Sequence, residues 1–250
     1  MGESHAYGAG RVDWAGEAML QPVRSTNAFE EVMERLMQAI KLGVLEHGER
    51  LPPERELATR LAVSRVTLRE AISALRGAGF VESRRGRHGG TFVTYQMPNE
   101  PDERNLRRAA EEMGGELADL LTYRMALETG AAQTAAQRDL SSAQRAYLQR
   151  RLVETETADP DQFRRADSRL HLAIAELTGS GSLTMSIAQT RMRLNELLDA
   201  IPILDLNIEH SHTQHRRIVQ AILAGDPAAA RSATEEHLEA TASLLRGFLS

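Results

Sequence analysis

The sequence predicts a mostly α-helical protein of two domains: a small N-terminal helical domain that ends in a β-hairpin, and a C-terminal all-α antiparallel helical bundle. Hydrophobic residues recur at helical spacing from residue 27 onward, which predicts the first helices. Two short apolar segments within residues 80–95 flank a glycine-rich tip, which predicts the hairpin. Beyond residue 115 no segment alternates like a strand, and 250 residues, 42% of them hydrophobic, can bury two modest cores.

The first domain follows a tail, residues 1–24, in which glycines and few aliphatic residues predict disorder. Its second helix starts at Leu51-Pro52-Pro53-Glu54, since proline is tolerated in a first helical turn. Ser64 is a good N-cap for the third helix. The expected elements of this domain, which we place at residues 25–96, are a helix from Asn27 to about Gly43, the short second helix, a helix at 65–76, and strands at 80–83 and 91–95.

Two prolines in Met97-Pro98-Asn99-Glu100-Pro101 predict a linker, which we place at residues 97–114. The second domain comprises residues 115–250. Asp159-Pro160 and Asp226-Pro227 each combine a helix N-cap with proline at the first helical position. The expected helices of the bundle are 115–137, 141–157, 160–178, 183–199, 207–224 and 227–248.

Composition excludes several classes of protein. The chain has no cysteine, which excludes disulfides, thiolate zinc sites, iron–sulfur clusters and a cysteine nucleophile, and indicates a reducing compartment. No apolar run approaches the roughly 18–20 residues of a membrane span. The N-terminal tail lacks the apolar core of a signal peptide. We therefore expect a soluble cytoplasmic protein without membrane contacts.

Positive charge is concentrated in the first domain. Residues 60–95 contain seven arginines and two acidic residues, although the whole chain carries a net charge of −5. The order helix, short helix, tight turn, helix and basic hairpin is that of a winged helix-turn-helix, whose third helix enters the major groove of DNA. Arg65 and Arg69 lie about one turn apart on that helix, where they can reach guanine or phosphate oxygens. The alternative is a helical domain whose arginines are simply solvated.

The first domain closely resembles the GntR family of bacterial transcription regulators over most of residues 28–95. The resemblance rests on three motifs: Leu51-Pro52-Pro53-Glu54-Arg55-Glu56-Leu57-Ala58, Ser64-Arg65-Val66-Thr67-Leu68-Arg69-Glu70-Ala71 and Gly89-Gly90-Thr91-Phe92-Val93. It implies that operator DNA is contacted by the matching residues, which are Arg55, Ser64, Arg65, Thr67, Arg69, Arg85 and Gly86. The wing is longer than the shortest family form, so which wing residue enters the groove stays open.

Histidines and a carboxylate lie on the apolar faces of three predicted helices of the second domain. Asp167 and His171 share one face at i, i+4 spacing, while His215 and His237 fall within the apolar stripes of two later helices. Burying these groups unpaired would be costly, whereas a divalent cation would satisfy them. Zn²⁺ and Ni²⁺ suit such ligands best, followed by Mn²⁺. The alternative is that each histidine has its own backbone partner; His212 is the runner-up ligand.

The second domain resembles the effector domain of the FadR subfamily, called the FCD domain, over about residues 115–245. The matching motifs are Arg124-x3-Glu128, Asp167-x3-His171, the stretch from His215 to Asp226, and His237. The resemblance implies a metal held by Asp167, His171, His215 and His237, with open positions for a carboxylate effector. Members that respond to acyl-CoA lack this metal set, which argues against a fatty-acyl-CoA effector. Thr178-Gly179-Ser180 departs from the usual Ser-Gly-Asn, which leaves contacts at Ser180 open.

Arg124 is the expected effector-binding residue, because its guanidinium group can form a bidentate pair with a carboxylate. A salt bridge to Glu128, four residues later, is an equally good explanation of this arginine. Arg191 and Arg193 are further candidates of the same kind.

The sequence therefore predicts a DNA-binding transcription regulator, expected to be a repressor, that binds an inverted-repeat operator as a homodimer and responds to a small organic acid. It is not expected to be an enzyme, because it has no His-Glu-x-x-His, Gly-x-Ser-x-Gly or phosphate-loop motif. Two alternatives stay open: a metallohydrolase fused to a DNA-binding head, and a regulator whose metal is purely structural.

Overall fold

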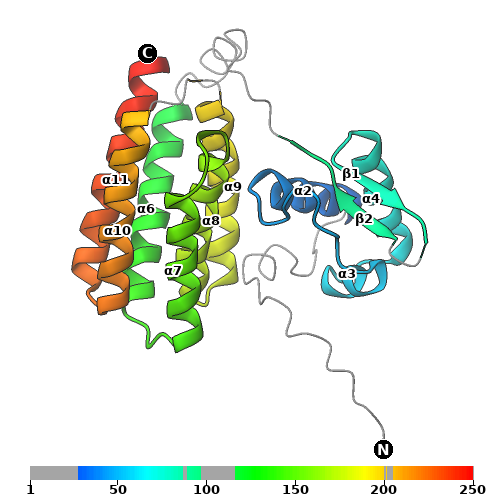
Figure 1. Cartoon of the computed structure of the whole chain (residues 1–250), viewed down its shortest axis with the longest axis horizontal. Helices are drawn as coiled ribbons and strands as arrows, with labels where there is room; N and C mark the ends of the chain where they lie inside the picture. The colour runs from blue at the N-terminus through cyan, green and yellow to red at the C-terminus, as the bar shows by residue number, and fades with distance from the viewer. Residues whose placement is uncertain (1–27, 87–88, 97–115, 200, 202–204, 250) are drawn as a thin grey trace, which may run out of the picture.

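The computed structural model describes residues 28–86, 89–96, 116–199, 201 and 205–249. A small domain of helices and one hairpin stands beside a larger helical bundle, so the predicted fold class is confirmed (Figure 1). The predicted tail at residues 1–24 and the predicted linker at residues 97–114 lie outside the described residues. The domain bounds therefore stay predictions.

The N-terminal domain, called the head below, is a winged helix-turn-helix. Every element contributes apolar side chains to its core, and leucines such as Leu36, Leu57 and Leu68 are fully buried. The two strands pair antiparallel, with Val81 opposite Val93 on the buried side. The elements of the head are α2 (Ala28–Lys41), α3 (Glu54–Arg60), α4 (Arg65–Gly77), β1 (Val81–Arg84) and β2 (Gly90–Val93).

The turn between α3 and α4 fixes the direction of α4, the third helix of the head. Ala62 adopts a left-handed backbone conformation, with φ of 53°, which costs about 1–2 kcal/mol for a residue with a Cβ. The amide of Val63 then donates to the carbonyl of Ala58 at 3.0 Å, which closes the C-terminal end of α3. Ser64 caps α4, because its side chain accepts from the amide of Thr67 at 3.0 Å.

The wing is attached to the helices through the segment before α3. The backbone of Arg50 forms an isolated antiparallel β-bridge with Phe92 in β2, and the amide of Leu51 donates to the carbonyl of Thr91 at 2.8 Å. Gly90, with φ of 153°, passes so close to the side chain of Arg50 that a Cβ at this position would collide with it. The hairpin is therefore held as part of the head.

In the described residues, the C-terminal domain consists of six helices. Helix α6 occupies the centre, since it packs against α8, α9, α10 and α11 (Figure 1). None of the described helices combines the length and the hydropathy needed to cross a bilayer. The helices are α6 (Glu116–Ala136), α7 (Ser142–Glu156), α8 (Pro160–Leu177), α9 (Gly181–Asp199), α10 (Asp205–Ala224) and α11 (Pro227–Leu249).

Two helices of the bundle begin earlier than the sequence predicts. Helix α9 starts at Gly181 rather than at residue 183, because the Ser180 hydroxyl accepts from the amide of Leu183 at 3.2 Å and caps the helix. Helix α10 starts at Asp205 rather than at residue 207, and an acidic residue in the first turn is favourable beside the helix dipole. The role that the structure gives Ser180 is thus that of a helix cap.

Candidate functional site

The residues predicted to contact DNA lie on the outer elements of the head. Helix α2 lies next to the bundle, whereas α3, α4 and the wing stand farther from it (Figure 1). Arginines from all three outer elements are exposed: Arg55 in α3, Arg65 and Arg69 in α4, and Arg85 beside Gly86 at the wing. The head therefore offers several unburied guanidinium groups on these elements, as a surface for a polyanion requires.

Three of these residues are held by neighbours. The Nε of Arg69 donates to Glu54 at 2.7 Å across the α3–α4 turn. The hydroxyls of Ser64 and Thr67 lie 2.8 Å apart at the start of α4. Their positions are thus defined before any DNA binds, although the operator contacts themselves stay predictions.

The four predicted metal ligands lie together inside the bundle. The Nε2 atoms of His215 and His237 are 3.3 Å apart, and Oδ1 of Asp167 lies 3.1 Å from Nε2 of His215 and 3.6 Å from Nε2 of His171. All four ligand atoms fall within 4.8 Å of one another. Helix α8 supplies Asp167 and His171 from adjacent turns of one face, while α10 and α11 supply one histidine each.

Acceptors behind the cluster fix the orientation of two imidazoles. Nδ1 of His171 is bonded to Glu128 on α6, and Nδ1 of His237 lies 3.0 Å from Oε1 of Gln214. An acceptor at Nδ1 favours the tautomer whose Nε2 carries a lone pair, which is the form that binds a metal. The two carboxylate oxygens of Asp167 also have separate partners. Oδ2 accepts from Arg191 on α9, and Oδ1 faces the cluster.

Burial and charge shift the pKa values of these groups in different directions. Burial lowers the pKa of His215, and burial together with two neighbouring imidazoles places the pKa of His237 well below its usual value. Burial would also lower the pKa of His171, but the carboxylates of Glu128 and Asp167 outweigh it and raise this pKa. His171 is thus the ligand that holds a proton most strongly.

The residues present fit a divalent cation. Nε2 of His171 is buried and has no hydrogen-bond partner among the described residues, although it faces the other ligand atoms. Three of the separations between ligand atoms are 3.1–3.6 Å, close enough for these atoms to bind one ion at the usual distances of about 2.0–2.2 Å. Three imidazole nitrogens and one carboxylate oxygen are ligands that first-row divalent ions prefer.

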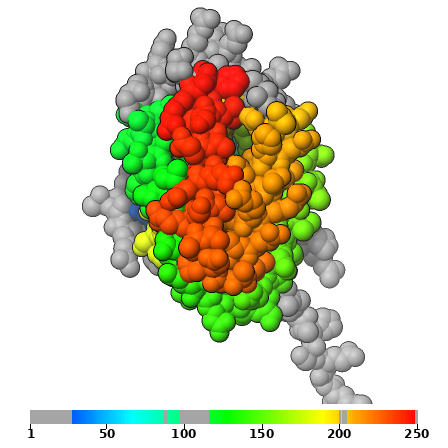
Figure 2. All heavy atoms as spheres, turned by 90° about the vertical axis from the view of Figure 1, so that its left-hand side faces the viewer, coloured from blue at the N-terminus to red at the C-terminus, as the bar shows by residue number. Residues whose placement is uncertain are grey.

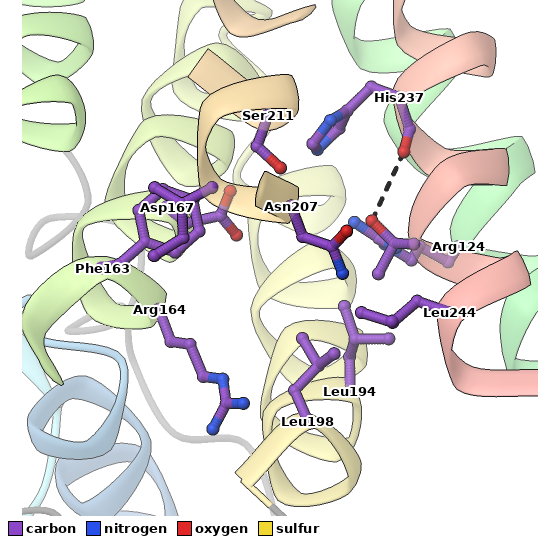
Figure 3. A pocket seen from close by; sticks show the side chains of 12 residues that line it. Arg124, Phe163, Arg164, Asp167, Leu194, Leu198, Asn207, Ser211, His237 and Leu244 are labelled. Carbon is purple, nitrogen blue, oxygen red and sulfur yellow. Dashed lines mark hydrogen bonds between the residues drawn. The ribbon is translucent and has the colours of Figure 1, made fainter. Parts of the chain in front are cut away.

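A pocket reaches the cluster from the surface. It encloses about 580 Å³ of empty space, open solvent included, and both Asp167 and His237 line it together with Arg124 (Figure 3). Figure 2 shows a hollow between the first part of α10 and the last part of α11, the segments that contribute Ser211 and Thr241 to this lining. The remaining lining is mainly apolar: Phe163, Leu194, Leu198, Ile208 and Leu244, with Arg164 and Asn207.

Arg124 forms the salt bridge to Glu128 that the sequence offered as one explanation, and it also lines the pocket, while its role in effector binding stays a prediction. Its Nε donates to Glu128 at 2.9 Å, while its Nη1 is buried without a partner among the described residues and the side chain lines the pocket. Arg191 is fully buried against Asp167, so it supports a ligand, whereas Arg193 is exposed and pairs with Glu116 at 2.7 Å.

His212 is not part of the metal cluster. Its ring packs edge-on against Phe163, with 5.5 Å between the ring centroids.

Comparison with known proteins agrees with the two halves of this structure. Residues 28–93 match the gntR family of bacterial regulatory proteins, and residues 119–240 match the FCD domain. The HTH-type transcriptional regulator RmpR of Mycobacterium gastri is 35% identical over 84% of this chain and 77% of its own length. The chain belongs to the GntR family, in the FadR subfamily that carries an FCD domain.

Two further comparisons cover most of the length of this GntR regulator. A protein of Escherichia coli strain K12, named as the L-lactate dehydrogenase operon regulatory protein, is 31% identical over 88% of this chain and 86% of its own length. The solved structure of E. coli McbR/YncC covers 89% of this chain and 99% of its own, with a TM-score of 0.51 and 21% identity, which supports the fold alone. The relatives are named as transcription regulators rather than enzymes.

The sequence interpretation missed the residues behind the ligands. The sequence alone pairs Glu128 only with Arg124, makes Arg191 only a candidate for effector binding, and predicts no role for Gln214. Each of these side chains meets its partner across two different helices, as the separations of 43, 24 and 23 residues show. A carboxylate or an arginine on an otherwise apolar helix face is the sequence feature that could have indicated Glu128 and Arg191, because such a group needs a buried partner.

The affinity for a divalent metal will fall as the pH drops through the raised pKa of His171, because the protonated ring has no lone pair at Nε2. Glu128→Gln removes the carboxylate that raises this pKa, so the midpoint will move to lower pH. The variant will also bind metal about 10–100-fold more weakly at its plateau, the usual effect of losing such a partner.

The measurement is competition against a chromophoric chelator between pH 5.5 and 8.5, with Glu156→Gln as the control, since Glu156 pairs with Arg216 at the surface. An unchanged midpoint in Glu128→Gln would contradict this assignment.

Proposed function

We propose that this GntR regulator, acting as a repressor in the cytoplasm, binds an inverted-repeat operator as a homodimer and releases it when a small carboxylate binds beside a divalent metal in the bundle. The observation that carries the proposal is the pocket that joins Asp167 and His237 of the cluster to Arg124. In this pocket a carboxylate can coordinate the metal and accept a hydrogen bond from the buried Nη1 of Arg124, which has no partner among the described residues.

The metal is Zn²⁺ or Ni²⁺, with Mn²⁺ as the third choice. Asp167, His171, His215 and His237 supply nitrogen and oxygen donors only, and the chain has no cysteine to favour a thiolate-preferring ion. Four protein ligands leave two positions of a six-coordinate ion for water or for a bidentate acid.

Charge balance favours an acid as the effector. The buried cations Arg124 and Arg191 balance the buried anions Glu128 and Asp167, so that the cluster is neutral when the imidazoles are neutral. A divalent cation adds two positive charges in a region of low dielectric, and an anion that reaches it through the pocket offsets them. The apolar lining at Leu194, Leu198 and Phe163 suits an acid with a small hydrocarbon body.

The name of the E. coli relative points to the same chemistry, because the operon that it regulates encodes an enzyme for a small organic acid, L-lactate. This supports the effector class without identifying the acid.

Helix α8 connects the effector pocket to the head, because it contributes residues to the pocket and to the contact with the head. Arg165 and Arg169 lie on the side of α8 opposite to Asp167, since residues two apart on a helix differ by about 200°. Nη2 of Arg165 donates to the carbonyl of Ile40 at 2.6 Å, and Nη1 of Arg169 lies 3.4 Å from the carbonyl of Gly43. These arginines therefore cap the C-terminal end of α2, where carbonyl groups carry partial negative charge.

Close packing makes this contact sensitive to position. Gly43 is left-handed, with φ of 73°, and a Cβ there would lie 3.1–3.3 Å from the side chains of Arg165 and Arg169. A shift of α8 that improves the geometry of Asp167 and His171 around the metal therefore also changes the contact that Arg165 and Arg169 make with the head on the opposite face.

Replacing Arg65 or Arg69 by alanine will weaken operator binding by about 1–3 kcal/mol if these side chains contact bases. The operator is obtained by selection from random duplex DNA, and affinities are measured by fluorescence anisotropy at fixed salt, since the salt concentration sets the phosphate contribution. Arg217→Ala, on the exposed face of α10, is the control. Wild-type affinity in both variants would refute the DNA-binding surface.

A small organic acid will stabilise the metal-loaded protein and release the operator, and both effects will be lost in metal-stripped protein and reduced in Arg124→Ala. Coupling of this kind typically changes the operator affinity by about 1–3 kcal/mol. A panel of acids is titrated by thermal shift and by operator anisotropy. His210→Ala, an exposed histidine on α10, controls for general effects of substitution.

The two alternatives predict different outcomes of that titration. A purely structural metal predicts that no acid changes operator affinity, and a metallohydrolase predicts turnover of the added compounds. An acid that acts equally on wild type, metal-stripped protein and Arg124→Ala would show that neither the metal nor Arg124 forms the effector site.

The double variant Arg165→Ala/Arg169→Ala will still bind the effector but will lose most of the effector-dependent change in operator affinity, because the contact between α8 and α2 is removed. Effector affinity is measured by calorimetry and operator release by anisotropy. Arg216→Ala, a surface arginine on α10, is the matched control. A wild-type response in the double variant would exclude this route.

A further inference from the structure

Val66 is exposed to an unusual degree for a large apolar side chain. It is the second residue of α4, and 66% of it is accessible to solvent, more than for any other large hydrophobic residue in the described part of the chain. It lies outside the hydrophobic core of the head, which includes its neighbours Leu68 and Ala71.

The fold of the head gives no reason for a valine here. At about 100° per residue, Val66 points about 170° away from the mean direction of the buried residues of α4. A β-branched side chain at an exposed helical position is also less favourable than alanine, because it loses rotamer freedom. Single exposed apolar residues are common on protein surfaces, but the position of this one is specific, since it adjoins Arg65 and Thr67.

The surroundings of Val66 fit DNA better than an apolar protein surface. Arg65 and Arg69, which are exposed, lie one and three residues from it on α4, and Arg55 on the preceding helix α3 is exposed as well. Placing them against an apolar partner would remove water from charged groups without compensation. Against DNA, the same arginines contact phosphates or guanines while the N-terminal turn of α4 enters the major groove.

We infer that Val66 reads the 5-methyl group of a thymine in each half-site of the operator. The inference rests on the proposed DNA-binding function and adds a residue that determines sequence specificity. Thymine is the base that presents a methyl group in the major groove, and apolar side chains recognise it by contact. Valine has no hydrogen-bonding atom in its side chain, so among the features of the groove only this methyl group suits it.

The size of the effect follows from the burial of one methyl group, which is worth ~0.8 kcal/mol, or about a fourfold change in affinity. An inverted repeat that contacts two heads would double this free energy and give about a 15-fold change. Both values are large enough to measure by titration.

The experiment replaces each thymine of the selected operator by deoxyuridine, which removes the methyl group and leaves the base pair intact. Full-length wild-type protein will show one thymine per half-site whose replacement weakens binding about fourfold. In Val66→Ala this sensitivity will disappear, so that the thymine and deoxyuridine operators bind equally. Alanine is the better helix former at this position, so the variant is expected to keep its fold.

Two further variants complete the test. Val66→Thr keeps a methyl group on Cβ and will retain part of the sensitivity, and Val153→Ala, at a 54% exposed valine on α7, will retain all of it. If no thymine shows methyl sensitivity, or if Val66→Ala keeps it in full, the inference is wrong. Failure of the wild type to select any operator would instead refute the proposed function itself, so the two failures are distinguishable.

Discussion

Burial of ionisable groups inside the helical bundle is the constraint from which the rest of this structure follows. Arg124 and Glu128 on α6, Asp167 and His171 on α8, and Arg191 on α9 are nearly excluded from solvent. Such burial is tolerated only when every charge has a partner at close range. The carboxylates meet this condition by using one oxygen for an arginine and the other for an imidazole. Because the pair of Glu128 with His171 joins α6 to α8, and the pair of Asp167 with Arg191 joins α8 to α9, the relative positions of these three helices depend on them.

The same constraint explains why a metal site could control the head. Helix α8 cannot move freely on its inner face, where Asp167 and His171 are tied to Arg191 and Glu128. On its outer face it holds the carbonyl of Ile40 at the end of α2. A cation and an anion that join the cluster redistribute the charges on the inner face, and a closely packed helix responds by discrete shifts rather than by gradual deformation.

Much of this arrangement could be predicted from the sequence, because it depends on local periodicity. The i, i+4 spacing placed Asp167 and His171 on one face, and Ser64 and the prolines at the first positions of α8 and α11 marked helix starts correctly. The partners behind the ligands could not be found in this way. Glu128 and His171 are 43 residues apart, and nothing in either helix alone indicates which buried acid meets which imidazole. His212 lies within one turn of His215, yet tertiary packing directs its ring to Phe163 and away from the cluster.

The head and the bundle use arginine in opposite ways, and this difference suits a switch. In the bundle, Arg124 and Arg191 are buried, so that removing or adding one charge nearby changes the free energy of the whole cluster. In the head, Arg55, Arg65 and Arg69 are exposed, so that salt screens their charges. Under the proposed function, two heads on an inverted repeat must engage together to reach a specific affinity. On that proposal, a change in the angle of each head, produced at the α8–α2 contact, would misalign both half-sites at once. A coupling of about 1–3 kcal/mol, the ordinary size, would then be enough to release the operator.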